Sequence, residues 1–296
     1  MPEPEARGAR GSEEGTHMVD RADAHIHLFE GGYRSSFTGR PGVRVDEAAL
    51  YDSLAREHGV RRALVVGYAD APWCRGNNAW ILARASEYAW ARPLAYADPL
   101  DPPDLPALER LGAAGAVGLS LYILGEERAA ALARVPAAAW GWLAERGWLI
   151  SVNSRPALWP AWEGVLRQHP GLRLLAAHLG QPPRASRPPA PRDAADALAG
   201  LIALARYPGV HVKVSGFYAF SDPGYAYPHR AVWPYVEALL AAYGPERLLW
   251  ASDFTPCLDM VSFPQTVGLL AEMPFLGAAE RRAIEGGNLL ALLGEG

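Results

Sequence analysis

The feature that most constrains this chain is a regular alternation of short apolar runs with longer segments of helical spacing. From residue 18 onward, eight short runs rich in Leu, Val and Ala are separated by segments whose apolar residues recur every three or four positions. Uninterrupted short apolar runs are typical of strands that are buried on both faces. We therefore expect strands at residues 19–24, 62–68, 93–97, 116–122, 148–152, 173–177, 210–215 and 247–252.

The intervening segments predict helices at residues 46–58, 77–91, 104–111, 126–146, 157–169, 193–207 and 229–243, with 264–272 and 280–293 closing the chain. Eight strand–helix units favour a closed (β/α)₈ barrel, or TIM barrel, over an open doubly wound sheet. Such a barrel takes about 250 residues, so we expect one α/β TIM-barrel domain over 18–296. Residues 1–17 are polar and predict a disordered tail, and Met18 is an alternative start. The proline-rich stretch 181–192 predicts a surface loop or a lid.

Composition excludes several classes of function. The net charge is −4 with no cluster of basic residues, which disfavours nucleic acid and membrane surfaces as partners. No apolar stretch has the length of a membrane span, and the N-terminus lacks the apolar core of a signal peptide. The two cysteines, Cys74 and Cys257, are far apart in sequence and predict reduced thiols. We expect a cytoplasmic protein, and leave a homodimer open.

A pair of histidines ends the first predicted strand, in the motif Asp23-Ala-His25-Ile-His27. Residues two apart on a strand point to the same face, so both imidazoles can reach one divalent ion at about 2.1 Å. In a barrel, this is the end of the strands where active sites are built. We predict that His25 and His27 bind a metal; packing of two histidines in the core is the alternative.

Two more polar residues follow apolar runs in the same way. His178 comes directly after the run LLAA, and Asp253 comes directly after the run at 247–252. A buried carboxylate is costly unless it meets a cation or hydrogen-bond donors, and it can bind a metal or take a proton from water. Three imidazoles and one carboxylate suit Zn²⁺. The alternatives are a structural histidine and a helix-capping aspartate.

The motifs DAHIHLF, LLAAHLG and LLWASDFTP, in this order, resemble barrel strands of the amidohydrolase superfamily. The resemblance covers roughly residues 18–294 and is closest to the branch of sugar-acid lactonases, dicarboxylate lactonases and metal-dependent decarboxylases. It implies that His25, His27 and His178 are metal ligands, that Asp253 is a ligand or the catalytic base, and that His178 is also catalytic. It implies one divalent ion, most readily Zn²⁺, or none, since some lactonases of the branch work without metal.

One further strand separates the two chemistries of this branch. Residues 211–216, HVKVSG, are similar to a strand common in lactonase-like members. Decarboxylase-like members place a further histidine near the end of a late strand, whereas His211 lies at the start of its strand. Lys213 is the only strand lysine available to a carbamylated two-metal centre, so one metal is favoured over two.

The loops after the barrel strands choose the substrate, and several residues there are candidate contacts. Arg155 and Arg34 can each bind a carboxylate through two parallel hydrogen bonds, or lie in solvent. Lys213, on an apolar strand, is either a buried ion-pair partner or a substrate ligand. The other candidates are the polar residues Asn153 and Ser215, and an apolar wall of Tyr122, Trp73 and Tyr218.

Together these patterns predict a metal-dependent hydrolase of a small organic substrate, a lactone or related cyclic ester. Metal or histidine would polarise the carbonyl, and Asp253 would activate the attacking water. The first alternative is non-oxidative decarboxylation of an aromatic or unsaturated carboxylic acid. The second, from a different class, is a barrel that binds a small ligand without turnover.

Overall fold

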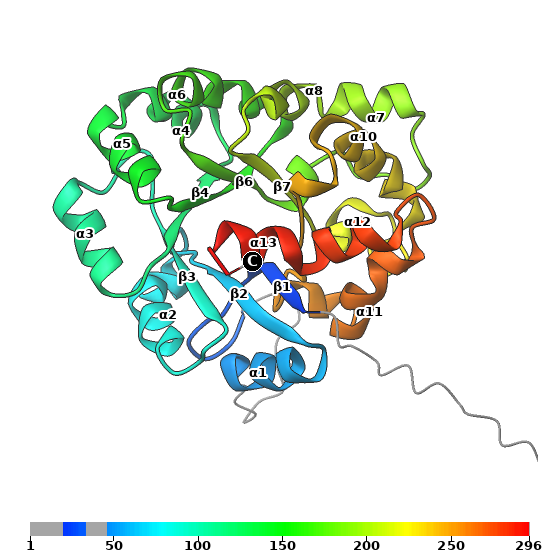
Figure 1. Cartoon of the computed structure of the whole chain (residues 1–296), viewed down its shortest axis with the longest axis horizontal. Helices are drawn as coiled ribbons and strands as arrows, with labels where there is room; N and C mark the ends of the chain where they lie inside the picture. Colours follow the sequence, from blue (N-terminus) through cyan, green and yellow to red (C-terminus); the bar gives the residue numbers. More distant parts are fainter. Residues whose placement is uncertain (1–19, 34–45, 296) are drawn as a thin grey trace, which may run out of the picture.

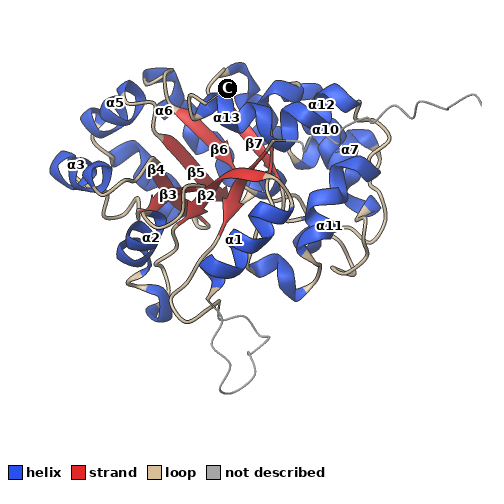
Figure 2. Cartoon of the chain, turned by 60° about the horizontal axis from the view of Figure 1, so that its bottom comes forward, coloured by secondary structure: helices blue, strands red, loops and turns tan. Residues whose placement is uncertain are grey.

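A computed structural model of the chain describes residues 20–33 and 46–295. Its centre is an eight-stranded parallel barrel with helices around it (Figures 1 and 2). All eight predicted strands are confirmed, with ends within two residues of the expected positions. The predicted tail at 1–17, Met18 and Arg34 lie outside the described residues. The strands are β1 (Arg21–Ile26), β2 (Val60–Val66), β3 (Ala91–Tyr96), β4 (Gly118–Ile123), β5 (Leu149–Ser154), β6 (Arg173–Ala176), β7 (Val210–Val214) and β8 (Leu248–Trp250).

The barrel is closed by contacts between β1 and the residues that follow β8. The backbone N–H of Asp253 donates to the carbonyl oxygen of His25 at 3.0 Å, and the N–H of His27 donates to the carbonyl of Phe254. A parallel bridge pairs Ile26 with Phe254. The single-domain (β/α)₈ expectation is therefore confirmed, and the closing seam runs through the HxH motif.

Leucines fill one end of the barrel interior, where the strands begin, and the C-terminal helix covers this amino end. Buried side chains from six of the eight strands meet there: Ala22, Leu64, Leu94, Leu149, Leu175 and Leu249. Leu289 and Leu290 of α13 (Asn288–Leu292) pack against this layer, and Figure 1 shows α13 lying across the barrel. Gly286 allows this approach, because a Cβ there would lie 2.2 Å from the carbonyl oxygen of Asp20. The amino end of the barrel is thus a packed core, and the site must lie at the carboxyl end.

The helices surround the barrel in chain order. They are α1 (Glu47–Glu57), α2 (Asn77–Ala85), α3 (Leu105–Ala113), α4 (Glu126–Ala131), α5 (Ala137–Glu145), α6 (Trp162–Gln168), α7 (Pro191–Ala197), α8 (Ala199–Ile202), α9 (Phe217–Phe220), α10 (Trp233–Tyr243), α11 (Phe263–Gly268), α12 (Ala278–Arg282) and α13. Among the described residues, no helix is long and apolar enough to cross a membrane.

The prediction of one helix over 126–146 is wrong. The chain forms α4, a short 3₁₀ turn (Leu132–Arg134) and then α5. The break falls at Val135, which takes an extended conformation (φ −61°, ψ 128°) because the following Pro136 disfavours the helical region. The prediction over 193–207 also divides, at Leu198 (φ −107°, ψ 8°).

The proline-rich stretch forms a loop that pairs with the segment after β7. Pro191 and Arg192 already belong to α7, so the loop ends at Ala190, two residues earlier than predicted. The N–H of Ala185 donates to the carbonyl of Phe220 at 2.8 Å, and the N–H of Asp222 donates to the carbonyl of Ala185 at 3.0 Å. These bonds tie the β6 loop to the α9 region on the carboxyl side of the barrel.

Candidate active site

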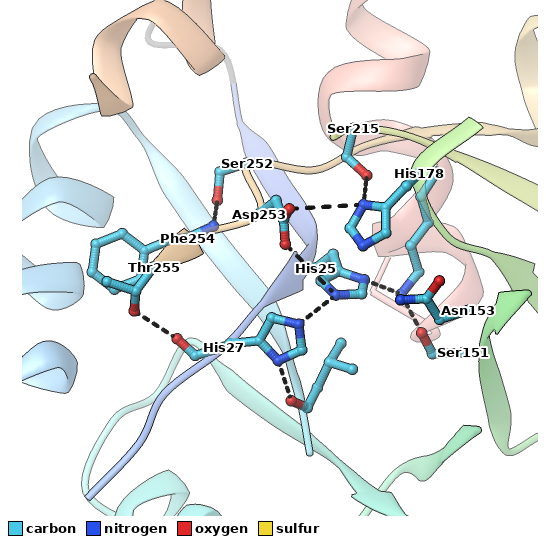
Figure 3. Close-up of polar contacts among 12 residues, drawn as sticks. His25, His27, Ser151, Asn153, His178, Ser215, Ser252, Asp253, Phe254 and Thr255 are labelled. Carbon is cyan, nitrogen blue, oxygen red and sulfur yellow. Dashed lines mark hydrogen bonds and ion pairs between the residues drawn. The ribbon is translucent and has the colours of Figure 1, made fainter. Parts of the chain in front are cut away.

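The four predicted metal-site residues converge where their strands end (Figure 3). The Nε2 atoms of His25 and His27 are 2.9 Å apart. An Asp253 carboxylate oxygen lies 3.9 Å from His25 Nε2, and the other lies 3.9 Å from His178 Nδ1. His25, His178 and Asp253 each offer one ligand atom, and these atoms all lie within 4.8 Å of one another. Residues far apart in sequence thus share one small volume.

The histidines of this cluster are neutral at neutral pH. Burial lowers the pKa of His27 to about 4 and that of His178 to about 3, in the latter case with help from the nearby charge of Lys213. Burial also holds the pKa of His25 well below its usual range. A neutral imidazole has one nitrogen lone pair available, so these side chains suit metal binding or hydrogen-bond acceptance.

Asp253 is a buried carboxylate with an elevated pKa. Burial raises its pKa to about 6, opposed by the electrostatic interaction with the His27 imidazole and by a hydrogen bond from Tyr218. The Tyr218 hydroxyl donates to Oδ2 at 2.5 Å. Asp253 has a left-handed backbone (φ 58°), an uncommon conformation for a non-glycine residue that recurs at functional sites. The carboxyl is therefore ionised at neutral pH yet close to the range of an effective general base.

Asp23, also in the DAHIH motif, supports the site through hydrogen bonds to the backbone on both sides of it. Its Oδ1 accepts the backbone N–H groups of His25 (3.1 Å) and Ser252 (3.0 Å), and its Oδ2 accepts the Tyr51 hydroxyl (3.0 Å). It therefore joins β1 to the residues after β8. The sequence carried a signal for this role, because Asp23 shares strand parity with His25 and His27.

Lys213 lies beneath His25, fully buried. Its ammonium donates to Ser151 Oγ at 2.6 Å and faces His25 Nδ1 at 3.2 Å. Burial lowers its pKa to about 7, opposed by the charges of Asp23 and Asp253. The direct contacts of Lys213 are thus with neutral groups, and it interacts with the carboxylates of Asp23 and Asp253 only through longer-range electrostatics. It does not line the pocket described below, and its role as a substrate ligand stays a prediction.

The turn after β7 holds His178 in place. Ser215 Oγ lies 3.0 Å from His178 Nδ1. Gly216 has a φ of 72°, and a Cβ at this position would lie 2.9 Å from His178 Nδ1. Only glycine takes this conformation readily and leaves room for the imidazole. The same turn leads into α9, which carries Tyr218, so one short segment contacts both His178 and Asp253.

The chemistry of the donors fits a divalent metal. His27 Nδ1 bonds to the carbonyl oxygen of Val66 at 2.8 Å, which places the proton on Nδ1 and leaves Nε2 as a ligand. Two nitrogens bound to one ion at about 2.1 Å are roughly 3.0–3.4 Å apart, close to the 2.9 Å between the Nε2 atoms of His25 and His27. With His178 and Asp253 this is a set of imidazole and carboxylate donors that Zn²⁺ accepts.

A cavity of about 360 Å³ opens above the cluster, large enough for a small organic molecule. His27, His178 and Asp253 form part of its lining, together with the predicted contacts Asn153, Tyr122 and Trp73. Arg155 is exposed and is not among the lining residues. Arg34 falls outside the described part of the chain, so its predicted contact stays untested.

Besides the roles of Asp23 and Gly216, sequence reasoning missed those of Tyr218 and Tyr68. Tyr218 was expected in an apolar wall, but its hydroxyl is bonded to Asp253. Nothing in a single sequence indicates this contact, because it depends on how α9 is placed. Tyr68 joins the pocket wall, and its ring lies 4.8 Å from that of Tyr122. His211 lies at the start of β7, with Nδ1 3.2 Å from the carbonyl oxygen of Gly209, away from the cluster as expected.

Comparisons with known proteins indicate the family of this chain. A family model described as amidohydrolase matches residues 22–294. An L-fucono-1,5-lactonase from Burkholderia ambifaria is 33% identical over 135 residues, which span 44% of this chain and 44% of the relative. The alignment therefore covers less than half of either protein.

Two solved structures share the fold. An amidohydrolase from Burkholderia multivorans with bound zinc has a TM-score of 0.72 and 22% identity, covering 93% of this chain and 99% of the other. A probable 2-pyrone-4,6-dicarboxylic acid hydrolase from Acinetobacter baumannii has a TM-score of 0.68 and 17% identity, with coverages of 93% and 99%. With the barrel, its three motifs and a family match over nearly the whole chain, the protein belongs to the amidohydrolase family.

Proposed function

We propose that this protein is a metal-dependent hydrolase that opens a small lactone or related cyclic ester. The observation that carries the proposal is the position of Asp253, a buried base held within 4 Å of two neutral imidazoles at the floor of a pocket. Family membership supports hydrolysis, and the partial match to a lactonase supports a cyclic ester. A cytoplasmic location and a homodimer stay predictions.

In the proposed reaction, Asp253 accepts a proton from water as the water oxygen attacks the carbonyl carbon. The ring C–O bond then breaks, and the proton passes from Asp253 to the leaving alkoxide oxygen, giving a hydroxy acid. Tyr218 holds the carboxylate in orientation, and Ser215 orients the ring of His178. A divalent ion such as Zn²⁺, held by His25, His27, His178 and Asp253, would polarise the carbonyl when bound.

The test is a panel of small lactones, with hydrolysis followed by proton release in weakly buffered solution. The wild-type protein should open at least one of them, and Asp253→Asn should lower kcat by about 10²–10⁴-fold while remaining folded, as judged by circular dichroism. Full activity of Asp253→Asn would overturn the proposal. Metal analysis of the purified protein should find about one equivalent of divalent ion.

Product analysis separates the alternatives. Release of CO₂ from an aromatic or unsaturated acid would indicate a decarboxylase, and the place of His211 at the amino end of β7 disfavours this reaction. Ligand binding with no chemical change in any substrate would indicate a non-catalytic barrel.

A further inference from the structure

The turn after β6 is left-handed over four consecutive residues. Its φ angles are 53°, 56°, 75° and 61° at His178, Leu179, Gly180 and Gln181. This conformation is unfavourable for residues with a Cβ, and only one of the four is glycine. Trp159 Nε1 anchors the turn by donating to the carbonyl oxygen of Gly180 at 3.1 Å. Strain of this kind is retained where surrounding contacts enforce it, and it recurs at functional sites. The turn fixes Gln181 as well as His178.

Gln181 contacts the pocket through one of the residues that line it. Asn153, at the end of β5, lines the pocket together with His178 and Asp253. Gln181 is half-buried and is not itself among the lining residues. Its side-chain N–H group donates to the side-chain oxygen of Asn153. The strained turn therefore holds one amide against another, and only the second of them faces a ligand.

This contact decides which end of the Asn153 amide faces the pocket. A side-chain amide accepts at its oxygen and donates at its nitrogen, and the oxygen of Asn153 is already bonded to Gln181. Burial holds the pKa of Tyr122, another lining residue, well above its usual range, and a hydrogen bond from Asn153 opposes this rise. A bond that opposes it is one in which the phenol oxygen accepts. One N–H of Asn153 thus points to Tyr122, and no other described residue accepts from this nitrogen.

We propose that Gln181 is a positioning residue for specificity: it keeps Asn153 turned so that the amide N–H donates to an acceptor oxygen of the substrate. The inference rests on the proposed lactonase function and adds a requirement on its substrate. A ligand with a carbonyl, ring or hydroxyl oxygen at this place gains a hydrogen bond. A ligand that presents only an N–H donor there meets a second donor and is disfavoured.

The side-chain amide signals of asparagine report this orientation in the protein without any ligand. The chain has four asparagines, so isotope-labelled asparagine should give four pairs of amide signals in NMR spectra, and Asn153→Asp identifies one pair. A carboxylate only accepts hydrogen bonds, so in Gln181→Glu the amide nitrogen of Asn153 should turn toward it. One Asn153 proton should then move downfield, into a charge-assisted hydrogen bond. Unchanged Asn153 signals would overturn the inference, whatever reaction the protein catalyses.

Binding of N-methyl-δ-valerolactam tests the contact with a ligand. This cyclic amide has a carbonyl acceptor, lacks an N–H donor and resists hydrolysis. Titration of the wild-type protein should shift the Asn153 amide signals, and the indole signal of Trp73, which also lines the pocket, gives the affinity. Gln181→Glu should weaken binding by about tenfold, and so should Asn153→Asp, which keeps the bond from Gln181 but has no N–H. An unshifted Asn153 signal, or equal affinity in Gln181→Glu, would overturn the inference.

A double-mutant cycle separates positioning from a general effect on the fold or on charge. In an Asn153→Ala background, Gln181→Glu should cause no further loss of lactam affinity, because Gln181 acts through Asn153. Gln181→Met, of similar length and without charge, should cause a smaller loss than Gln181→Glu, since the Asn153 amide can then rotate. A further loss in the Asn153→Ala background would contradict the positioning role. Lactam binding with the expected dependence, but without hydrolysis of any lactone, would defeat the lactonase proposal alone.

Discussion

At the scale of single residues, the site depends on the buried carboxyl group of Asp253, whose pKa is raised by burial toward neutral pH. Asp253 must be ionised to accept a proton from water, and its pKa is raised to about 6. The ionised fraction falls as pH drops through this value, so kcat/KM should fall with it. A bound cation favours the carboxylate and lowers the midpoint further.

We therefore expect the acid limb of the kcat/KM profile to have a midpoint no higher than about 6. The measurement is a pH–rate profile with saturating metal, repeated for Asp253→Asn, which should lack this limb. A wild-type profile with no acid limb would contradict the role of Asp253 as base.

Tyr218 gives a second prediction at this scale. Its hydroxyl donates to Asp253 and stabilises the ionised carboxylate. Tyr218→Phe should lower kcat by about tenfold, with KM little changed, because hydrogen bonds to charged groups contribute about 1.5–3 kcal/mol. It should also move the acid limb to higher pH, since the lost bond favoured the charged form. Tyr225→Phe is the matched control, because Tyr225 is 71% exposed. An unmoved limb would assign Tyr218 a packing role only.

At the scale of elements, the turn from β7 into α9 sets the relation between His178 and Asp253. Gly216→Ala would place a Cβ 2.9 Å from His178 Nδ1 in a left-handed conformation. We expect metal affinity to fall by roughly 10–100-fold, because the turn orients a ligand. Isothermal titration calorimetry with Zn²⁺ measures this change in metal affinity.

Gly115→Ala controls for backbone strain. Gly115 has a φ of 95°, with open space around its Cβ position. Both substitutions should lower the free energy of unfolding by about 1–2 kcal/mol, but only Gly216→Ala should lose metal affinity. Equal metal affinity in the two variants would contradict the positioning role of the turn.

The elements also show where sequence reasoning succeeds. Strands such as β6 and β7 were predictable because runs of buried aliphatic residues leave few alternatives. The motifs DAHIH, AAHLG and ASDF mark the ends of β1, β6 and β8. Helix ends were less predictable. Pro136 interrupts a segment whose apolar spacing continues on both sides, and periodicity alone does not locate such a break. Tyr218 and Gly216 were not predictable as site residues, because their contacts depend on tertiary placement.

At the scale of the whole molecule, the packed layer and the pocket of the barrel are lined by different residues. The amino end is sealed by Leu289 and Leu290, and the site lies at the opposite end. Leu289→Ala should lower the free energy of unfolding by about 2–4 kcal/mol through a cavity. It should leave kcat/KM unchanged, because the affected layer is distant from the pocket.

Denaturant titration and steady-state kinetics check this together. Leu105→Ala, at a leucine that is 37% exposed, should change stability by no more than about 0.5 kcal/mol. A large loss of kcat/KM in folded Leu289→Ala would show that the two ends are coupled.

The seam between β1 and the residues after β8 has a further consequence. There a backbone hydrogen bond joins Asp253 to His25 and their side chains lie 3.9 Å apart, although the two residues are separated by most of the chain. A ligand bound by both residues would link the first and last strands of the barrel. It should therefore slow unfolding and shift the unfolding equilibrium toward the folded state. Catalytic activity should also indicate that the barrel has closed, because an open barrel would not bring His25 and Asp253 to the same substrate.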